Sequence, residues 1–364
     1  MDRVQEAGAS GRMAARTRIL AALTTTGPHG KAIDMVLRLG LLGAARIAPV
    51  AIIEPARLLP GAEVVAVAAR DPMRAAAFAG AHAIAHVSPT YEALIERADV
   101  DLIYNALPIP LHERWTVAAL RAGKHVLLEK PSASSAESAR RMVECARESG
   151  RRLIEAFHYR YHPLFRRILE IAPELGDIHD VKAVIDVPVP QRPGEIRWDP
   201  AMAGGALMDL GCYPVHWLRT LCGPFDVVSC ELEMAPAGVD AAATCALRFH
   251  SGPHAAIFCS MKPHDRGRLT TLAVTGARGE LFVRNPIAPQ MGHELRWRRD
   301  GDKAWREEQA PMTTSYFHQL EAVAHAISNK LPLPTEGGDI IDNLAALEAL
   351  YAAGGHPRTD NSPG

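Results

Sequence analysis

A run of small residues that could bind phosphate follows the first apolar run of the chain. Residues 36–42 are strand-like and lead into Gly43-Ala44-Ala45-Arg46-Ile47-Ala48. Gly43 permits a tight turn, and the small Ala45 and Ala48 let the backbone approach a pyrophosphate while a helix packs against the strand. The pattern predicts a dinucleotide site at residues 43–47. The same residues also fit an ordinary strand-to-helix turn, and the surrounding series of strands and helices favours the first interpretation.

Two arginines stand where the second strand-like run ends. The chain there reads Ala68-Ala69-Arg70-Asp71-Pro72-Met73-Arg74, without the acidic residue that would bind the ribose 2′-hydroxyl of NAD. Arg70 and Arg74 are one helical turn apart and could hold a 2′-phosphate through charge-assisted hydrogen bonds. NADP is therefore favoured, with NAD as the alternative. Both arginines would also fit as solvated charges beside a helix that Asp71 caps.

These residues need a parallel sheet with intervening helices to position them. Apolar runs rich in Val, Ile and Leu alternate with helix-like stretches, which is typical of parallel strands buried on both faces. The runs lie at residues 36–42, 63–68, 100–106, 125–128 and 153–156. Helix signals fall between them, including Asp71-Pro72 as a start, Ser134-Ser135 as a start and Gly150 as an end. We therefore predict a doubly wound Rossmann domain over residues 36–157.

After about residue 175 the pattern changes to strand-like runs with little helix between them. These runs lie at residues 181–189, 227–233, 243–249, 255–261, 269–275 and 280–284. Short turns join the last of them, so we predict a large, mostly antiparallel open sheet in an α+β domain over residues 158–364. Helices at about 315–328 and 339–352 are expected to close the chain. Residues 1–35 precede the first strand and are expected to form a mobile tail.

The composition excludes several classes of protein. The 364 residues are 48% hydrophobic and 22% charged, with a net charge of −1, which suits a globular two-domain protein rather than a nucleic-acid binder. No apolar run is long enough to span a membrane. The six cysteines include no C-x-x-C pair, which favours reduced thiols in the cytoplasm. The 16 histidines show no metal-ligand spacing, so we expect no metal.

Three stretches, taken in order, resemble the Gfo/Idh/MocA family, named for glucose-fructose oxidoreductase and inositol dehydrogenase. They are the turn at residues 43–48, the stretch 119–131 that ends in Glu129-Lys130-Pro131, and the stretch 204–213 that runs from Gly204 to Tyr213. The resemblance covers nearly everything from Leu37 to Tyr351, and three motifs at family spacing are specific. It implies a nicotinamide-dependent oxidoreductase that forms a homodimer or homotetramer through the open face of its second sheet.

The resemblance also implies a set of catalytic residues. Lys130 is expected near the nicotinamide and the substrate hydroxyl, with Asp209 and Tyr213 against the same site. A spacing of four puts Asp209 and Tyr213 on one face if this stretch is helical. Many members carry His where this chain has Tyr213. A Tyr at this position makes the chain similar to the branch that contains dimeric dihydrodiol dehydrogenase and NADP-linked xylose dehydrogenase. Each residue alone also fits a packing or solvated role; the three together favour catalysis.

A tyrosine at this position changes the expected acid/base chemistry. A phenol is a poor base at its ordinary pKa near 10, and a nearby ammonium group would favour the phenolate. We therefore expect Lys130 to lower the pKa of Tyr213, Tyr213 to act as general acid/base, and Asp209 to orient them. His216, three residues beyond Tyr213, is the reserve candidate for the proton transfer.

The resemblance assigns further residues to the two ligands. Those expected on the nicotinamide side are Asn105, Pro108, His112 and Glu129. Those expected to approach the substrate are Arg160, His162 and His216.

Together these features predict an NADP-dependent dehydrogenase or reductase that acts on a CH–OH carbon of a sugar, polyol or cyclic diol. Two alternatives remain open at this point. One is a family member that cleaves glycosides with tightly held NAD. The other is a dinucleotide-binding sensor without turnover, because alanine replaces two glycines of the turn at residues 43–48.

Overall fold

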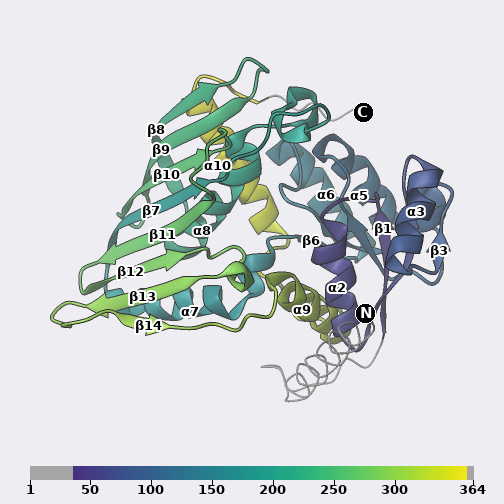
Figure 1. Cartoon of the computed structure of the whole chain (residues 1–364), viewed down its shortest axis with the longest axis horizontal. Coiled ribbons are helices and arrows are strands. Elements are labelled where there is room, and N and C mark those ends of the chain that lie inside the picture. The colour runs from purple at the N-terminus through teal and green to yellow at the C-terminus, as the bar shows by residue number, and fades with distance from the viewer. Residues whose placement is uncertain (1–35, 359–364) are drawn as a thin grey trace, which may run out of the picture.

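The computed structural model describes residues 36–358, which form two sheets with helices packed between and around them (Figure 1). The parallel sheet and its helices occupy one side of the molecule. A larger, mostly antiparallel sheet occupies the other side, with its strands stacked along one edge of the view. The predicted fold class is therefore confirmed. The tail expected at residues 1–35 lies outside the described residues.

The first sheet has six parallel strands in the order β3-β2-β1-β4-β5-β6. Its order reverses beside β1, so β1 and β4 flank the switch point where doubly wound sheets bind ligands. Strand β5 has the predicted bounds, and each end of the other predicted strands lies within two residues of the observed end. The strands are β1 (Leu37–Leu42), β2 (Ala62–Ala68), β3 (His86–Val87), β4 (Leu102–Asn105), β5 (His125–Leu128) and β6 (Leu153–Glu155).

Helices with the predicted start and stop signals connect these strands. Asp71 caps α3 by accepting hydrogen bonds from the amides of Met73 and Arg74, and Ser135 caps α6 through the amide of Ser138. Gly150 ends α6 in the left-handed conformation, which glycine adopts without strain. The helices are α2 (Glu54–Leu58), α3 (Pro72–His82), α4 (Tyr91–Ile95), α5 (His112–Arg121) and α6 (Ala136–Ser149).

One helix from far along the chain completes the core of the first sheet. Helix α9 (Ser315–Asn329) buries Phe317, Leu320 and Val323 in the same hydrophobic cluster as residues of β1 and β4. In Figure 1 it lies beside α2, below the parallel sheet. A segment near the C-terminal end therefore belongs structurally to the dinucleotide half.

The second sheet has eight strands in the order β14-β13-β12-β11-β7-β10-β9-β8. Only β7 and β10 pair in parallel. Strands β13 and β14 extend the sheet beyond the predicted set. The strands are β7 (Ile178–Asp186), β8 (Phe225–Met234), β9 (Asp240–Phe249), β10 (His254–Ser260), β11 (Leu269–Gly276), β12 (Gly279–Arg284), β13 (Glu294–Arg299) and β14 (Arg306–Glu308).

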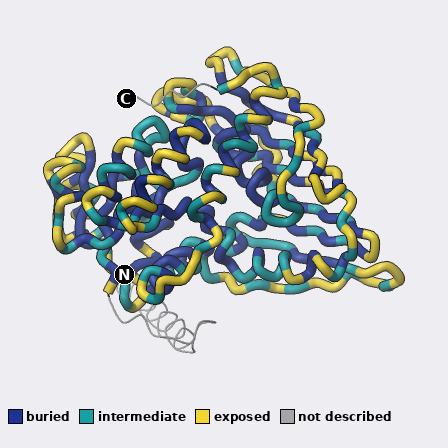
Figure 2. The backbone as a smooth tube through the Cα atoms, turned by 180° about the vertical axis from the view of Figure 1, so that it is seen from behind, coloured by how far each residue is buried: buried dark blue, intermediate teal, exposed yellow. Residues whose placement is uncertain are grey.

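Three helices cover the inner face of this sheet, α7 (Pro163–Ile171), α8 (Cys212–Cys222) and α10 (Gly338–Ala353). The tube in Figure 2 is buried along the inner strands and helices and exposed mainly at loops. Between residues 36 and 358, no helix is both long and apolar enough to cross a membrane. Short helical turns complete the fold: Pro49–Ile53, Ile109–Leu111, His158–Tyr161, Ala172–Leu175, Ile196–Trp198, Pro200–Met202, Leu207–Gly211 and Pro289–Met291.

Candidate active site

The turn after β1 has the shape that a dinucleotide site needs. Gly43 adopts φ +93°, and a Cβ atom there would lie 3.2 Å from Leu107, so a larger residue would be strained. A helix follows almost at once, because Pro49 lies in its first turn. Within the described residues, no hydrogen bond uses the amides of Ala44, Ala45, Arg46 or Ile47. These free N–H groups suit an anion such as a diphosphate.

The two predicted phosphate-binding arginines lie beside this turn. Both are exposed. The Arg74 guanidinium donates a hydrogen bond of 2.8 Å to the carbonyl oxygen of Ala44, which places it against the turn itself. Arg70 is fixed through its amide, which donates to the Tyr91 hydroxyl at 3.1 Å. Two cations therefore stand at the end of β2, where a 2′-phosphate would lie.

Three residues named from the motifs meet at the interface of the two sheets, and we call them the Lys130 trio: Lys130, Asp209 and Tyr213. Lys130 follows β5, and its ammonium group donates to the Asp209 carbonyl at 2.8 Å and to Oδ1 of the Asp209 carboxylate at 2.9 Å. The same nitrogen lies 4.9 Å from the centre of the Tyr213 ring. Asp209 and Tyr213 belong to one continuous helical stretch, as their spacing predicts.

Burial, rather than charge, sets the protonation state of Tyr213. Its side chain is 8% exposed, and burial raises its pKa well above the ordinary value although the Lys130 charge acts to lower it. The Lys130 charge thus acts in the expected direction, but burial outweighs it and the net pKa of Tyr213 is raised. Burial also disfavours the charged form of Lys130, but the Asp209 carboxylate outweighs it and holds the Lys130 pKa well above its ordinary value. The trio thus contains an ammonium, a carboxylate and a neutral phenol.

Glu129, next to Lys130, takes part in a second cluster. The Tyr104 hydroxyl donates to Glu129 Oε1 at 2.5 Å, and burial raises the pKa of Glu129. The nearby Tyr316 on α9 is a residue that the motifs did not indicate. Its ring lies 4.0 Å from that of His158, and its pKa is raised by burial and by the charge of Glu129.

The residues after β4 fasten loops around the site. Asn105 is fully buried and donates to the Thr116 hydroxyl at 3.1 Å. Both ring nitrogens of His112 contact backbone carbonyls, Leu107 at 2.7 Å and Ser132 at 3.1 Å. His112 therefore joins the β4 loop to the loop that carries Lys130. Pro108 precedes the turn Ile109–Leu111 and is half-buried.

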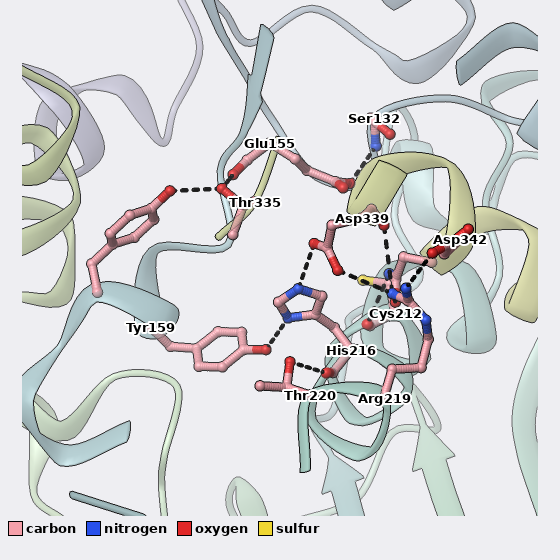
Figure 3. A network of polar contacts seen from close by, with 12 residues as sticks. Ser132, Glu155, Tyr159, Cys212, His216, Arg219, Thr220, Thr335, Asp339 and Asp342 are labelled. Carbon is pink, nitrogen blue, oxygen red and sulfur yellow. Dashed lines mark hydrogen bonds and ion pairs between the residues drawn. The ribbon is translucent and has the colours of Figure 1, made fainter. Parts of the chain in front are cut away.

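His216 lies in a different environment from Tyr213 although the two share α8. It belongs to a group that we call the His216 trio, in which Tyr159 and His216 are buried and Asp339 is half-buried (Figure 3). Its Nδ1 contacts the Tyr159 hydroxyl, its Nε2 contacts the Asp339 carboxylate at 2.8 Å, and its ring stacks on Phe157. Both nitrogens are used inside the fold, and burial lowers the pKa of His216.

The two remaining candidates lie near α7. His162 is fully buried and caps this helix, with Nδ1 accepting from the Leu164 amide at 3.0 Å. Its Nε2 contacts the carbonyl oxygens of Pro311 and Thr313, each at 3.1 Å. Arg160 is half-buried, and its guanidinium lies 5.6 Å from the centre of the Phe165 ring. Neither contacts the Lys130 trio.

Two family models match this chain and together cover both sheets. One, described as an oxidoreductase family with an NAD-binding Rossmann fold, matches residues 37–157. The other, described as the GFO/IDH/MocA C-terminal domain, matches residues 166–282. The chain belongs to the Gfo/Idh/MocA family. The resemblance inferred from the three motifs is thereby confirmed.

Several similar members of the Gfo/Idh/MocA family are named for reactions on sugars or diols. The chain is 32% identical over 314 residues to D-xylose 1-dehydrogenase (NADP(+)) 2 of Haloferax volcanii, covering 86% of this chain and 95% of that protein. It is 32% identical over 258 residues to trans-1,2-dihydrobenzene-1,2-diol dehydrogenase of Sus scrofa, covering 69% and 75%. A 3-ketoreductase from Actinomadura kijaniata, solved with NADP and TDP-benzene, superimposes with a TM-score of 0.79 at 27% identity, covering 87% and 97%.

Beyond the motifs shared with the Gfo/Idh/MocA family, a loop of the second half reaches the Lys130 trio. Residues 187–206, which we call the strap, connect β7 to the helical stretch that carries Asp209. Arg197 in the strap lies 3.9 Å from Asp209 Oδ2, and Glu195 lies 3.5 Å from Arg46 of the cofactor turn. Sequence reasoning missed both. The only signal was a group of charged residues shortly before Gly204-Gly205, a pattern that many surface loops share.

In the part of the chain that the structure describes, no three His, Cys, Asp or Glu side chains are grouped so that they could hold a metal ion.

Proposed function

We propose that this protein is an NADP-dependent oxidoreductase that transfers hydride between the nicotinamide and a CH–OH carbon of a sugar, polyol or cyclic diol. The observation that carries the proposal is the Lys130 trio, in which Lys130 contacts both Asp209 and Tyr213 beside the cofactor sheet. The names of the relatives, a xylose dehydrogenase and a dihydrodiol dehydrogenase, support the substrate class.

The cofactor would bind across the turn at residues 43–47. The free amides of that turn suit the diphosphate, and Arg70 and Arg74 suit the 2′-phosphate. When bound, the nicotinamide supplies the hydride, and the protein supplies orientation and proton transfer. Asn105, Pro108, His112 and Glu129 would shape the nicotinamide side through the loops that they fasten.

Tyr213 is proposed to move the proton. In the direction of reduction, the neutral phenol donates its proton to the carbonyl oxygen as hydride reaches the carbon. No hydrogen bond joins the Tyr213 hydroxyl to another residue of the described chain, so it is available to a substrate. Lys130 stabilises the negative charge that develops on the substrate oxygen, and Asp209 holds Lys130 in place.

In the direction of oxidation the same groups act in reverse. The substrate hydroxyl must lose a proton, so the phenolate of Tyr213 is the competent form. Because burial raises the Tyr213 pKa, the phenolate is scarce at neutral pH. Oxidation is therefore expected to speed up with rising pH, whereas reduction keeps its rate until the pH approaches the raised pKa.

A substrate panel tests the proposal directly. Purified protein would be mixed with NADP⁺ or NAD⁺ and with D-xylose, D-glucose, glycerol or trans-1,2-cyclohexanediol, and reduced nicotinamide would be followed by its absorbance. We expect turnover of at least one compound, faster with NADP⁺, and loss of turnover in Tyr213→Phe. Tyr161→Phe is the matched control, since Tyr161 bonds Thr335 inside the fold. NADPH binding without turnover of any compound would contradict the proposal and favour a sensor.

We also propose that the protein works in the cytoplasm as a homodimer or homotetramer. The six cysteines are free thiols, which suits a reducing compartment. Half-buried apolar side chains of the second sheet, including Val184, Phe258 and Phe282, point away from the helices that cover its other face. They suit a contact with a second copy, and light scattering coupled to gel filtration would measure the assembly.

A further inference from the structure

The strap at residues 187–206 folds back on itself just before the helical stretch that carries Asp209. The amide of Gly205 donates to the Arg197 carbonyl at 3.0 Å, and a Cβ atom at Gly204 would lie only 2.5 Å from that carbonyl oxygen. A Cβ atom at Gly205 would lie 2.1 Å from the Asp240 carboxylate. The two glycines therefore let the end of the strap pack against the backbone of Arg197 and against Asp240 of β9, which fixes the position of the Arg197 backbone.

Glu195 is the strap's buried charge. Its side chain is 1% exposed, and three guanidinium groups lie within ion-pair distance of it, those of Arg46, Arg192 and Arg197. Oε1 accepts a hydrogen bond of 2.8 Å from Arg197 Nε, whereas Oε2 accepts none and has Arg46 at 3.5 Å and Arg192 at 3.6 Å. Burial disfavours its ionised form, yet Arg197 and Arg46 hold the Glu195 pKa below its ordinary value. A buried carboxylate that is ionised is strongly destabilising unless cationic groups pair with it.

Arg197 lies between the carboxylates of Glu195 and Asp209 and is much closer to that of Glu195. It bonds Glu195 through Nε, while its Nη1 stays 3.9 Å from Asp209 Oδ2. Lys130 meanwhile bonds the other oxygen of Asp209 at 2.9 Å. Asp209 is thus shared by a near cation, Lys130, and a more distant one, Arg197. The Nε of Arg197 is bonded to Glu195.

We propose that Glu195 is a positioning residue that restrains Arg197, so that Asp209 stays paired with Lys130. This inference rests on the proposed function, in which Lys130 and Tyr213 act on the substrate oxygen. An arginine can bind a carboxylate with two parallel hydrogen bonds, a stronger pairing than a lysine offers. Without the charge of Glu195, Arg197 turns to Asp209 and draws it away from Lys130.

Glu195→Gln tests this arrangement because it removes the charge and keeps the shape. Measured with NADP⁺ and the panel compound that the wild-type protein turns over fastest, kcat should fall on the order of tenfold, the scale of a disturbed but present acid/base group. The double variant Glu195→Gln/Arg197→Met should regain most of the lost kcat, because the competing cation is gone. A residue with only a structural role would not be rescued by a second truncation beside it.

Two further measurements separate positioning from cofactor binding. The NADPH dissociation constant should change less than about threefold in Glu195→Gln, because Arg46 is 69% exposed and its contact is weak. The rate at which acetic anhydride modifies Lys130, read by peptide mass spectrometry, should rise because a less tightly paired ammonium is more often neutral. It should return towards the wild-type rate in the double variant.

Glu170→Gln is the matched control. It makes the same chemical change in an arginine ion pair on α7, where Glu170 contacts Arg167 at 3.2 Å on the surface. All three readouts should stay at wild-type values. If Glu195→Gln lowers the thermal midpoint too far for assay, Glu195→Asp keeps the charge but loosens the contact to Arg197. A smaller loss of kcat is then expected, again relieved by Arg197→Met.

The outcomes separate this inference from the function beneath it. Suppose that the wild-type protein turns over a panel compound. If Glu195→Gln then has an unchanged kcat, or if the kcat of the double variant is as low as that of Glu195→Gln, the positioning role is overturned and the proposed function stands. A wild-type protein that binds NADPH but turns over none of the four panel compounds contradicts the proposed function, and the positioning role falls with it. Rescue in the double variant supports both.

Discussion

The Lys130 trio and the His216 trio lie along one helix and are made of similar chemistry. Each combines a nitrogen group, a carboxylate and a phenol. In the His216 trio both ring nitrogens are engaged and the phenol donates or accepts within the trio. In the Lys130 trio the lysine is engaged, but the Tyr213 hydroxyl is left without a partner among the described residues. The difference indicates that an uncommitted polar atom, rather than the presence of titratable groups, marks the reacting site.

The largest effect is expected from the Lys130 trio itself. Lys130→Met and Tyr213→Phe should each lower turnover roughly 10²–10⁴-fold, as is typical for lost acid/base catalysis, while NADPH affinity largely survives. The double variant should be little worse than the poorer single variant if the two act as a unit. Steady-state kinetics and NADPH fluorescence measure this, and multiplicative losses would show that the two residues have separate roles.

The second effect falls on stability rather than turnover. His216→Ala removes the partner of Tyr159 and of the Asp339 carboxylate, so the free energy of unfolding should fall by about 2–4 kcal/mol. Turnover per folded molecule should change little. Urea unfolding and kinetics on the same samples measure the two quantities. If His216→Ala abolished turnover while Tyr213→Phe left it near normal, His216 rather than Tyr213 would be the residue that transfers the proton. The His216 trio would then be the reacting site.

A third prediction applies the same criterion to the cofactor. Arg70 makes no side-chain hydrogen bond to another described residue, and Arg74 makes one to the cofactor turn. Replacing both with Ala should weaken NADP binding at least about tenfold and NAD binding much less, since charge-assisted contacts contribute roughly 1.5–3 kcal/mol each. Isothermal titration with both cofactors decides it. Equal weakening would remove these arginines from the 2′-phosphate site.

The last prediction is a pH dependence of stability from His158, whose ring packs against those of Tyr213 and Tyr316. Burial, assisted by the Lys130 charge, lowers the pKa of His158 to about 3. Below the unfolded pKa of about 6.5, His158 binds a proton in the unfolded chain but stays neutral in the folded chain. The free energy of unfolding therefore decreases as the pH is lowered. The slope from this group approaches about 1.4 kcal/mol per pH unit between pH 6 and 4. His158→Asn should flatten urea-unfolding free energies measured across that range, and an unchanged slope would contradict the shift.

Local sequence signals predicted most of the first sheet. Strand β5 has the predicted bounds, and α3 and α6 begin at the predicted caps, because these depend on neighbours in sequence. Strand β13 was missed because only two of its six residues, Leu295 and Trp297, are apolar, so the segment does not stand out as an apolar run. Strand β14 has only three residues, all charged.

The candidate site was predictable where motifs carried it and not elsewhere. The resemblance picked out Lys130 and Tyr213, which the structure brings together. It could not show that His216 contacts the carboxylate of Asp339, which lies 123 residues further along the chain, and so has both ring nitrogens engaged inside the fold. Nor could it show that burial would dominate the pKa of Tyr213, because burial depends on packing by segments distant in sequence.

Helix α9 bears on how the chain is synthesised. Phe317, Leu320 and Val323 fill the face of the first sheet next to β1 and β4. On the ribosome, the parallel strands leave the exit tunnel well before this helix does, and they must wait with an apolar face uncovered. Exposed apolar surface of that kind is what chaperones bind. The dinucleotide half therefore becomes complete only after α9 has been translated, and a fragment that stops at residue 157 would emerge with that face still uncovered.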